Sequence, residues 1–244
     1  MLELQKIVLC RDSKNILNGL WASARRGELT VLLGSNGTGK TSLLHSISGI
    51  LPRVSGDIIF EGKIVDPASE QWRGQLSYVL DNGGTIPLLT VREQIFLQCS
   101  LSDIEDEEAM MRASHVLDLF ELNHYRDYRA DELSAGLRKK LGIATGIVRD
   151  ADIYLFDEPF GALDIQSMAV FSRILEVLRS RGKIIIIATH SFQLIASLCD
   201  RIWELSNGLV LEHSDEAGMK KLGMETTVNG PSAAGHPIIL PWVT

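Results

Sequence analysis

Several features are scarce in this chain of 244 residues, and each scarcity excludes a class of protein. Cysteine occurs only at Cys10, Cys99 and Cys199, without a CxxC spacing or a Cys/His cluster, so neither a disulfide framework nor a zinc site is supported. We interpret these residues as reduced thiols of a cytosolic protein. The longest apolar runs, Ile153–Phe156 and Ile184–Ala188, are far shorter than the roughly 20 residues that span a bilayer. A function at a membrane would therefore require a partner.

Basic residues are also fewer than acidic ones. Lys and Arg number 24 against 31 Asp and Glu, which gives a formal net charge of −7 and disfavours nucleic-acid binding. The N-terminus, Met1–Lys6, is charged and lacks the apolar run of a signal peptide. Apolar residues are 45% and charged residues 23%, as in soluble globular proteins, and the length allows one large domain or two small ones.

The order of apolar patterns predicts an α/β chain with a helical middle. Short apolar runs bounded by turn residues predict buried parallel strands at Leu29–Leu33, Ile153–Phe156 and Lys183–Thr189. Helical spacing dominates Val91–Tyr128 and returns at Asp164–Ser180. We also expect a half-buried strand, one helix after the first buried strand and two hairpins, at residues 2–9, 41–50, 57–65 and 201–212. From His213 onward the composition shifts towards Gly, Ser and Pro, and we interpret residues 213–244 as an appendage.

The segment Gly34–Thr41 has the pattern G-x-x-x-x-G-K-[ST] between a predicted buried strand and a predicted helix, which is the context of a phosphate-binding P-loop. Its glycines let backbone N–H groups face nucleotide phosphates, and the helix adds its positive N-terminal end. Lys40 is expected to reach the β- and γ-phosphates, and the Thr41 hydroxyl to bind Mg²⁺. The residues expected to bind ATP here are Gly34, Ser35, Asn36, Gly37, Thr38, Gly39, Lys40, Thr41 and Ser42.

Two carboxylates, Asp157 and Glu158, follow the buried run Ile153–Phe156. They would lie where the strands of an open α/β sheet end, which is where such sheets bind ligands. We expect Asp157 to hold Mg²⁺, directly or through water, and Glu158 to orient or deprotonate the attacking water. Beside a P-loop, this pair predicts nucleotide hydrolysis.

Three further motifs identify a family resemblance. Leu133–Leu137, with the sequence Leu-Ser-Ala-Gly-Leu, resembles the LSGGQ signature of ATP-binding-cassette (ABC) ATPases. Gly161–Asp164 resembles the D-loop of that family, and His190 its switch histidine. The resemblance covers about residues 2–212 and implies an α/β fold. It would have a P-loop NTPase core of ABC type, with a mainly parallel sheet flanked by helices, an N-terminal antiparallel β portion and a helical subdomain.

The resemblance also implies an organisation and a mechanism. A single cassette would span residues 1–212, with a RecA-like core at 1–81 and 149–212, a helical subdomain at 82–148, and a C-terminal tail at 213–244. Two copies would pair head to tail around ATP, so that Ser134 and Gly136 of one copy complete the phosphate site of the other. His190 would contact the γ-phosphate, Asp164 would link the two sites, and the helical subdomain would touch a transmembrane permease subunit.

Three positions depart from the family pattern. Asp81 stands where the family has the Q-loop glutamine; its carboxylate can ligate Mg²⁺ but cannot donate an amide hydrogen bond. Leu137 replaces the last residue of the signature and removes one polar group. The aromatic residue that stacks on adenine is missing, and Cys10 and Arg11 occupy its region. Either Arg11 stacks on the base through its guanidinium group, or stacking is absent and nucleotide affinity is weaker.

The sequence therefore predicts an ATP-hydrolysing subunit of an ABC transporter, with catalytic residues Lys40, Glu158 and His190 and metal ligands Thr41, Asp157 and Asp81. It would work as a homodimer with ATP and Mg²⁺, held peripherally at the cytoplasmic face of the membrane by its partner, without nucleic acid and without inserting into the membrane. Export is favoured because several exporter-type cassettes lack the Q-loop glutamine, while import stays open and the substrate is not encoded. The alternative is a soluble ABC-type ATPase acting on DNA or ribosomes.

Overall fold

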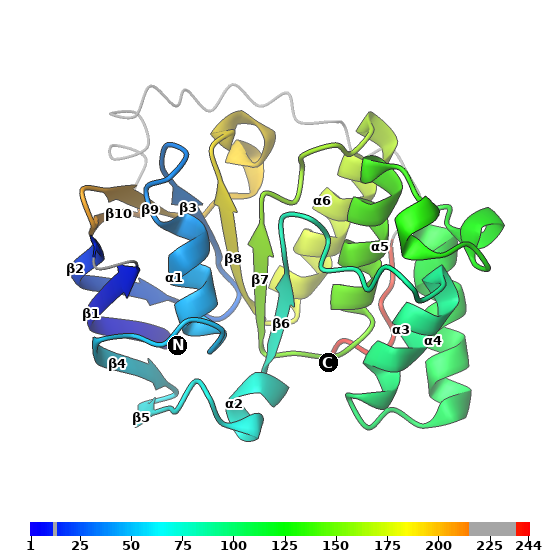
Figure 1. Cartoon of the computed structure of the whole chain (residues 1–244), viewed down its shortest axis with the longest axis horizontal. Helices are drawn as coiled ribbons and strands as arrows, with labels where there is room; N and C mark the ends of the chain where they lie inside the picture. The colour runs from blue at the N-terminus through cyan, green and yellow to red at the C-terminus, as the bar shows by residue number, and fades with distance from the viewer. Residues whose placement is uncertain (12–13, 215–237) are drawn as a thin grey trace.

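The computed structural model describes residues 1–11, 14–214 and 238–244, and it contains two β-sheets (Figure 1). The smaller sheet has four antiparallel strands in the order β2-β1-β4-β5. Its strands are β1 (Leu2–Arg11), β2 (Lys14–Ala24), β4 (Ser55–Phe60) and β5 (Lys63–Ile64). This sheet is the N-terminal antiparallel portion that the family resemblance implies.

The larger sheet has six strands in the order β10-β9-β3-β8-β7-β6, all parallel except for β10. The strands are β3 (Leu29–Leu33), β6 (Leu76–Val79), β7 (Ile153–Asp157), β8 (Ile184–Thr189), β9 (Arg201–Ser206) and β10 (Leu209–His213). Every residue of β7 and β8 is buried, which confirms the buried strands predicted from their apolar runs. The carboxyl ends of β3, β7 and β8 meet at one edge of the sheet, where the candidate site lies.

Helices cover both faces of this sheet, and a further group of helices lies beyond β6 (Figure 1). The helices are α1 (Lys40–Ile47), α2 (Glu70–Gly74), α3 (Val91–Ser100), α4 (Asp106–Leu119), α5 (Ala135–Ile147) and α6 (Ile165–Ser180). Short 3₁₀ turns occupy Asn123–Tyr125, Ala130–Glu132, Phe192–Leu194 and Ala196–Leu198. Within the described residues, no helix is long and apolar enough to cross a membrane.

The period-two alternation of the central strands divides the hydrophobic core into two. Leu155 and Ile186 face the side of α1 and the small sheet, where they pack with Leu43. Phe156 points to the other side, where Phe171 of α6 packs edge to face against it with ring centroids 5.0 Å apart. The cluster on that side continues into α3, α4 and α5, so the helical group shares one core with the sheet.

The sequence did not reveal strand β2, because a bulge interrupts its alternation. Leu17 and Leu20 are both buried although they are three residues apart, and Gly19 between them has a φ of 80°. The pairing of β1 with β2 shifts register in this region. A bulge inserts an extra residue and moves the following side chains to the other face, which hides the period of a strand.

The end of the chain differs from the appendage that we expected. Leu240, Trp242 and Val243 are buried in the core cluster that contains α3, α4 and α5. The indole of Trp242 donates to the carbonyl of Ile147 at 3.0 Å, and the guanidinium of Arg112 lies 5.4 Å from the ring centroid. Residues 238–244 are thus part of the fold, while residues 215–237 of the predicted tail lie outside the described residues.

Candidate functional site

The P-loop lies between β3 and α1, as predicted, and its backbone bends tightly around the lysine side chain. Gly39 has a φ of 108°, and a Cβ there would collide with Ile16 of β2, so the position requires glycine on two counts. Lys40 is only 7% exposed, and its ammonium donates to the carbonyls of Gly34 at 2.8 Å and Ser35 at 3.2 Å. The loop therefore holds a cation at its centre, at the N-terminal end of α1.

Thr41 and Asp157 come together across the sheet edge, as the sequence predicts for a magnesium site. The Thr41 hydroxyl donates to Oδ2 of Asp157 at 2.7 Å. Burial raises the pKa of Asp157, with smaller opposing contributions from the Thr41 hydrogen bond. A buried carboxylate beside a hydroxyl offers the hard oxygen ligands that Mg²⁺ prefers, so the residues present fit that ion.

Few protein groups would coordinate this ion. In the part of the chain that the structure describes, no group of three or more His, Cys, Asp or Glu side chains is arranged to hold a metal. A magnesium site with one or two protein ligands, completed by water and phosphate oxygens, is the usual arrangement in nucleotide-binding proteins.

Glu158 is held from several sides in a backbone conformation that side chains rarely adopt. Its φ is 43°, and its N–H donates to the carbonyl of Ala188 at 2.9 Å. The Thr189 hydroxyl donates to Oε2 at 3.0 Å, and the backbone N–H of His190 donates to Oε1 at 3.0 Å. Nδ1 of His190 lies 2.8 Å from Oε1, and the Lys40 ammonium lies 3.9 Å from it. The carboxylate thus sits among donors, facing the P-loop.

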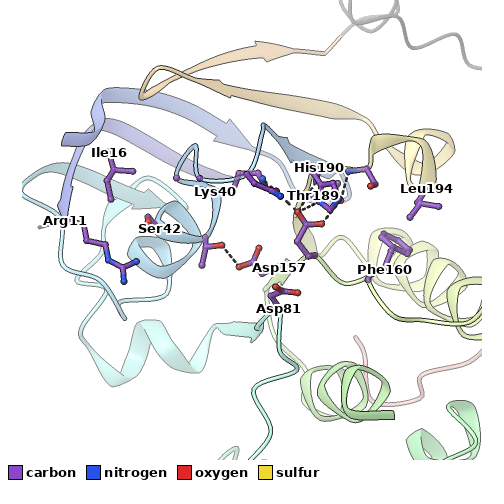
Figure 2. Close-up of a pocket in the computed structure, with 17 residues that line it drawn as sticks. Arg11, Ile16, Lys40, Ser42, Asp81, Asp157, Phe160, Thr189, His190 and Leu194 are labelled. Atoms are coloured by element: carbon purple, nitrogen blue, oxygen red, sulfur yellow. Dashed lines mark hydrogen bonds and ion pairs between the residues drawn. The ribbon is translucent and has the colours of Figure 1, made fainter. Parts of the chain in front are cut away.

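These groups open into one cavity of about 740 Å³ (Figure 2). Lys40, Asp157, Asp81 and His190 surround its centre, while Arg11 and Ile16 lie towards one end and Phe160 and Leu194 towards the other. The other residues that line it are Asn36, Gly37, Gly39, Thr41, Ser42, Glu158, Gly161, Thr189 and Ser191. The structure thus brings Arg11 and Ser42 to the same cavity as the catalytic candidates.

The signature candidates Ser134 and Gly136 lie beside the D-loop, and among the described residues neither they nor residues 162–164 line that cavity, which only Gly161 of these two motifs reaches. Ser134 caps helix α5 by accepting from the N–H of Leu137 at 3.3 Å. Gly136 packs so closely on the D-loop that a Cβ there would lie 2.7 Å from the carbonyl of Ala162. The phosphate loop and the signature of one copy therefore lie on two separate surfaces.

Asp164 is fixed by the signature helix of its own chain. It caps α6 by accepting from the N–H of Ser167 at 2.8 Å, and its Oδ2 lies 2.8 Å from the Lys140 ammonium. The hydrogen bond from Lys140 is the main reason that the pKa of Asp164 is lowered to about 2. An ionised carboxylate therefore stands between the D-loop and α5.

Sequence reasoning missed several residues of this site, three of which are Ile16, Thr189 and Lys139. Ile16 lies on the strand that the bulge conceals, and Thr189 is the last residue of an apolar run. Lys139 donates to the backbone carbonyl of Asp81, to Oδ1 of Asp81 at 3.2 Å and to the carbonyl of Glu158 at 2.9 Å. A lysine after the signature gives no local signal of such a role, because its partners are distant in sequence.

Comparisons with known proteins agree with this geometry. The sequence model of a family described as ABC transporter matches residues 17–161. A putative ABC transporter ATP-binding protein of Treponema denticola is 30% identical over 213 residues, which are 86% of this chain and 41% of that protein, so the chain spans less than half of this relative's length. The lipopolysaccharide export system ATP-binding protein LptB of Escherichia coli K12 is 28% identical over 203 residues, 82% of this chain and 84% of LptB.

Solved structures share the fold. The structure of an ATP binding subunit of an ABC transporter superposes with a TM-score of 0.84 at 24% identity, covering 92% of this chain and 94% of that one. A dimeric post-hydrolysis state of the ATP-binding cassette MJ0796, bound to ADP and Pi, has a TM-score of 0.77 at 22% identity, covering 88% and 98%. These likenesses confirm the predicted α/β P-loop NTPase fold of ABC type.

Proposed function

The chain belongs to the ABC transporter family and is an ATPase of that family, and from this premise we propose that two copies pair head to tail around ATP to drive a separate transmembrane subunit. One observation carries the proposal. The cavity has a P-loop, a Thr41–Asp157 pair that fits Mg²⁺ and a glutamate, but Ser134 and Gly136 lie on a different surface of the same copy. A second copy in head-to-tail orientation would supply them.

Each residue of the P-loop side has a role in holding ATP. The Lys40 ammonium, already bound to two loop carbonyls, would turn towards the β- and γ-phosphates, and the loop N–H groups would receive their oxygens. Thr41 and Asp157 would hold Mg²⁺, with Asp81 near enough to contribute through water. When bound, the ion would neutralise part of the negative charge of the phosphates.

Glu158 is the residue best placed to accept a proton from water. Its carboxylate lines the cavity and is oriented by Thr189 and His190. His190 would both fix Glu158 through Nδ1 and face the γ-phosphate with the rest of its ring. Asp164 would contact the second copy while Lys140 keeps it ionised. We assign no covalent step to the protein, because phosphoryl transfer depends on positioning and electrostatics.

The adenine base would lie at the end of the cavity formed by Arg11 and Ile16. Both side chains line the cavity, and neither is aromatic. We propose that the Arg11 guanidinium packs on the base in place of the missing aromatic ring. Replacement by alanine would then weaken ATP binding but leave the binding of inorganic triphosphate unchanged.

We further propose the domain division, direction and location that the sequence suggests. Residues 1–81 and 149–212 would form the RecA-like core, and residues 82–148 the helical subdomain that contacts a transmembrane permease at the cytoplasmic face of the membrane. LptB is named as part of a lipopolysaccharide export system, which supports export for this chain too.

The first test is Glu158→Gln, which keeps the shape of the side chain but removes its basicity. We expect hydrolysis to fall by roughly 10²- to 10⁴-fold, the usual contribution of a general base, with ATP binding retained. Size-exclusion chromatography should show a dimer with ATP and a monomer with ADP. Turnover at the wild-type rate would contradict the role of Glu158, and a variant that stays monomeric with ATP would contradict the dimer.

The second test is affinity purification from detergent-solubilised native membranes, with mass spectrometry of what co-purifies. A stoichiometric protein with several transmembrane helices is expected. Recovery of the chain alone, or with ribosomes or DNA, would favour the alternative of a soluble ABC-type ATPase. An associated extracytoplasmic substrate-binding protein would favour import over export.

A further inference from the structure

Lys139 is a buried cation whose three hydrogen-bond donors are all in use. It belongs to the signature helix α5, and only 4% of its surface is exposed. Its ammonium donates to the carbonyl and to Oδ1 of Asp81, and to the carbonyl of Glu158. An ammonium has three donors and no acceptor, so this set saturates it. One side chain thus joins a helix, the end of β6 and the residue after β7.

The turn after Asp81 lies directly on the backbone of the same helix. A Cβ on Gly142 of α5 would collide with the backbone of Gly83, and a Cβ on Gly83 would lie 2.6 Å from the carbonyl of Arg138. This glycine-on-glycine approach leaves no room for α5 to shift relative to the turn. Helix α5 and residues 81–84 therefore form one rigid contact, and Lys139 extends from it towards Glu158.

The backbone of Glu158 depends on its two peptide groups being held. Its N–H donates to the carbonyl of Ala188 of β8, and its carbonyl accepts from the Lys139 ammonium at 2.9 Å and, more weakly, from the N–H of Gly161 at 3.3 Å. A positive φ at a residue with a long side chain persists only where the surroundings impose it. Since these contacts fix the backbone from which the carboxylate extends towards Thr189 and His190, a displacement of α5 would be transmitted to Glu158 through Lys139.

We propose that Lys139 is a positioning residue that makes the orientation of Glu158 depend on helix α5 and the Asp81 turn. The proposal rests on the role of Glu158 given under the proposed function. The side chain of Asp81 can only accept, and the Lys139 ammonium is the donor that binds both it and the Glu158 carbonyl. A movement of helix α5 would then affect hydrolysis through the Lys139 ammonium.

The test measures kcat and ATP affinity separately in purified full-length protein. Lys139→Met keeps the length of the side chain but removes all three donors. We expect kcat to fall roughly tenfold or more, as for a misplaced catalytic group, while the equilibrium Kd for a fluorescent ATP analogue changes by less than about twofold. Lys139→Arg, which keeps the charge and donors, should retain more of kcat than Lys139→Met.

The background variant Glu158→Gln separates this proposal from the proposed function. Adding Lys139→Met to Glu158→Gln should cause no further loss of residual turnover, because the group being positioned is already inactive. If Glu158→Gln is fully active, the role of Glu158 fails. If Glu158→Gln is inactive but Lys139→Met has wild-type kcat, or if Kd rises as much as kcat falls, the positioning role fails. If Lys139→Met does not fold, Lys139→Gln takes its place in the comparison: an unchanged Kd with lowered kcat supports the role, and a wild-type kcat or a parallel loss of both overturns it.

Discussion

Nδ1 of His190 lies 2.8 Å from Oε1 of Glu158, and the backbone N–H of the same histidine donates to the same oxygen at 3.0 Å. Strand β8 ends one residue before His190, and β7 ends one residue before Glu158, so the pairing of these parallel strands brings the two side chains together. The carboxylate and the imidazole therefore act as a unit in which the histidine fixes the glutamate.

Removing this imidazole should slow hydrolysis more than it weakens nucleotide binding. In His190→Ala the backbone donor to Glu158 remains but the ring is lost, and we expect kcat to fall about 10- to 100-fold. Thr189→Val removes one hydrogen bond from an uncharged donor to the same carboxylate, keeps both His190 contacts and should cost less, about fivefold. Steady-state ATPase rates and the Kd for ATP check both variants. A His190→Ala variant with the kcat of wild type would refute the pairing as a functional contact.

Asp164 should titrate far below an ordinary aspartate. Its hydrogen bond with the Lys140 ammonium, together with the bonds from Ser167, lowers its pKa from 3.8 to about 2, so the folded state keeps the carboxylate ionised where the unfolded state begins to protonate it. The stabilisation is fully present above about pH 4 and is lost as the pH falls towards 2. It is small, because the Asp164 side chain is 54% exposed and solvent screens the ion pair.

The measurement is an NMR titration of the Asp164 carboxyl carbon in wild type and in Lys140→Met. In the variant the pKa should rise towards the ordinary value, while the N-cap hydrogen bond from Ser167 still holds it somewhat below. The same titration curve in both proteins would show that Lys140 does not contact Asp164 in solution.

A feature of this molecule can be predicted from the sequence when the residues that form it are close together in the chain. It is missed when those residues are far apart. The P-loop and the Asp157–Glu158 pair were predicted because strand, loop and chemistry are contiguous there, and the cavity contains both. Strand β2 was missed because the bulge at Gly19 disrupts its alternation. Lys139 could not be found, since its partners are 58 and 19 residues away and no local pattern joins them. The roles of the site residues stay predictions.

The C-terminal segment gives a stability prediction, since its three buried side chains complete the core next to α4. Trp242 is 5% exposed, donates to Ile147 and packs against Arg112 and His115. Trp242→Ala should lower the free energy of unfolding by about 3–5 kcal/mol, as for other large-to-small changes in a core. Ile239→Ala, at a side chain 59% exposed, should change it by about 0.5 kcal/mol or less. Urea unfolding measures both, and equal effects would show that the segment is not docked.

The contact between α5 and the Asp81 turn can be tested by the sign of a glycine substitution. An alanine in a helix is normally more stable than glycine by about 0.5–1 kcal/mol. At Gly142 the added Cβ would meet the backbone of Gly83, which cannot rotate away as a side chain could. Gly142→Ala should therefore destabilise the protein by about 1–3 kcal/mol, the range for overpacking.

Gly74, the last residue of α2, is the matched control, because a Cβ there would meet nothing within 4 Å and its φ is not positive. Gly74→Ala should be neutral or slightly stabilising, so the two substitutions are expected to have opposite signs in urea unfolding. Gly142→Ala should also lower kcat, because separating α5 from the turn pulls Lys139 away from Glu158. If both alanines stabilise the protein alike, α5 does not rest on the turn in solution. Lys139 would then have no fixed base from which to hold Glu158.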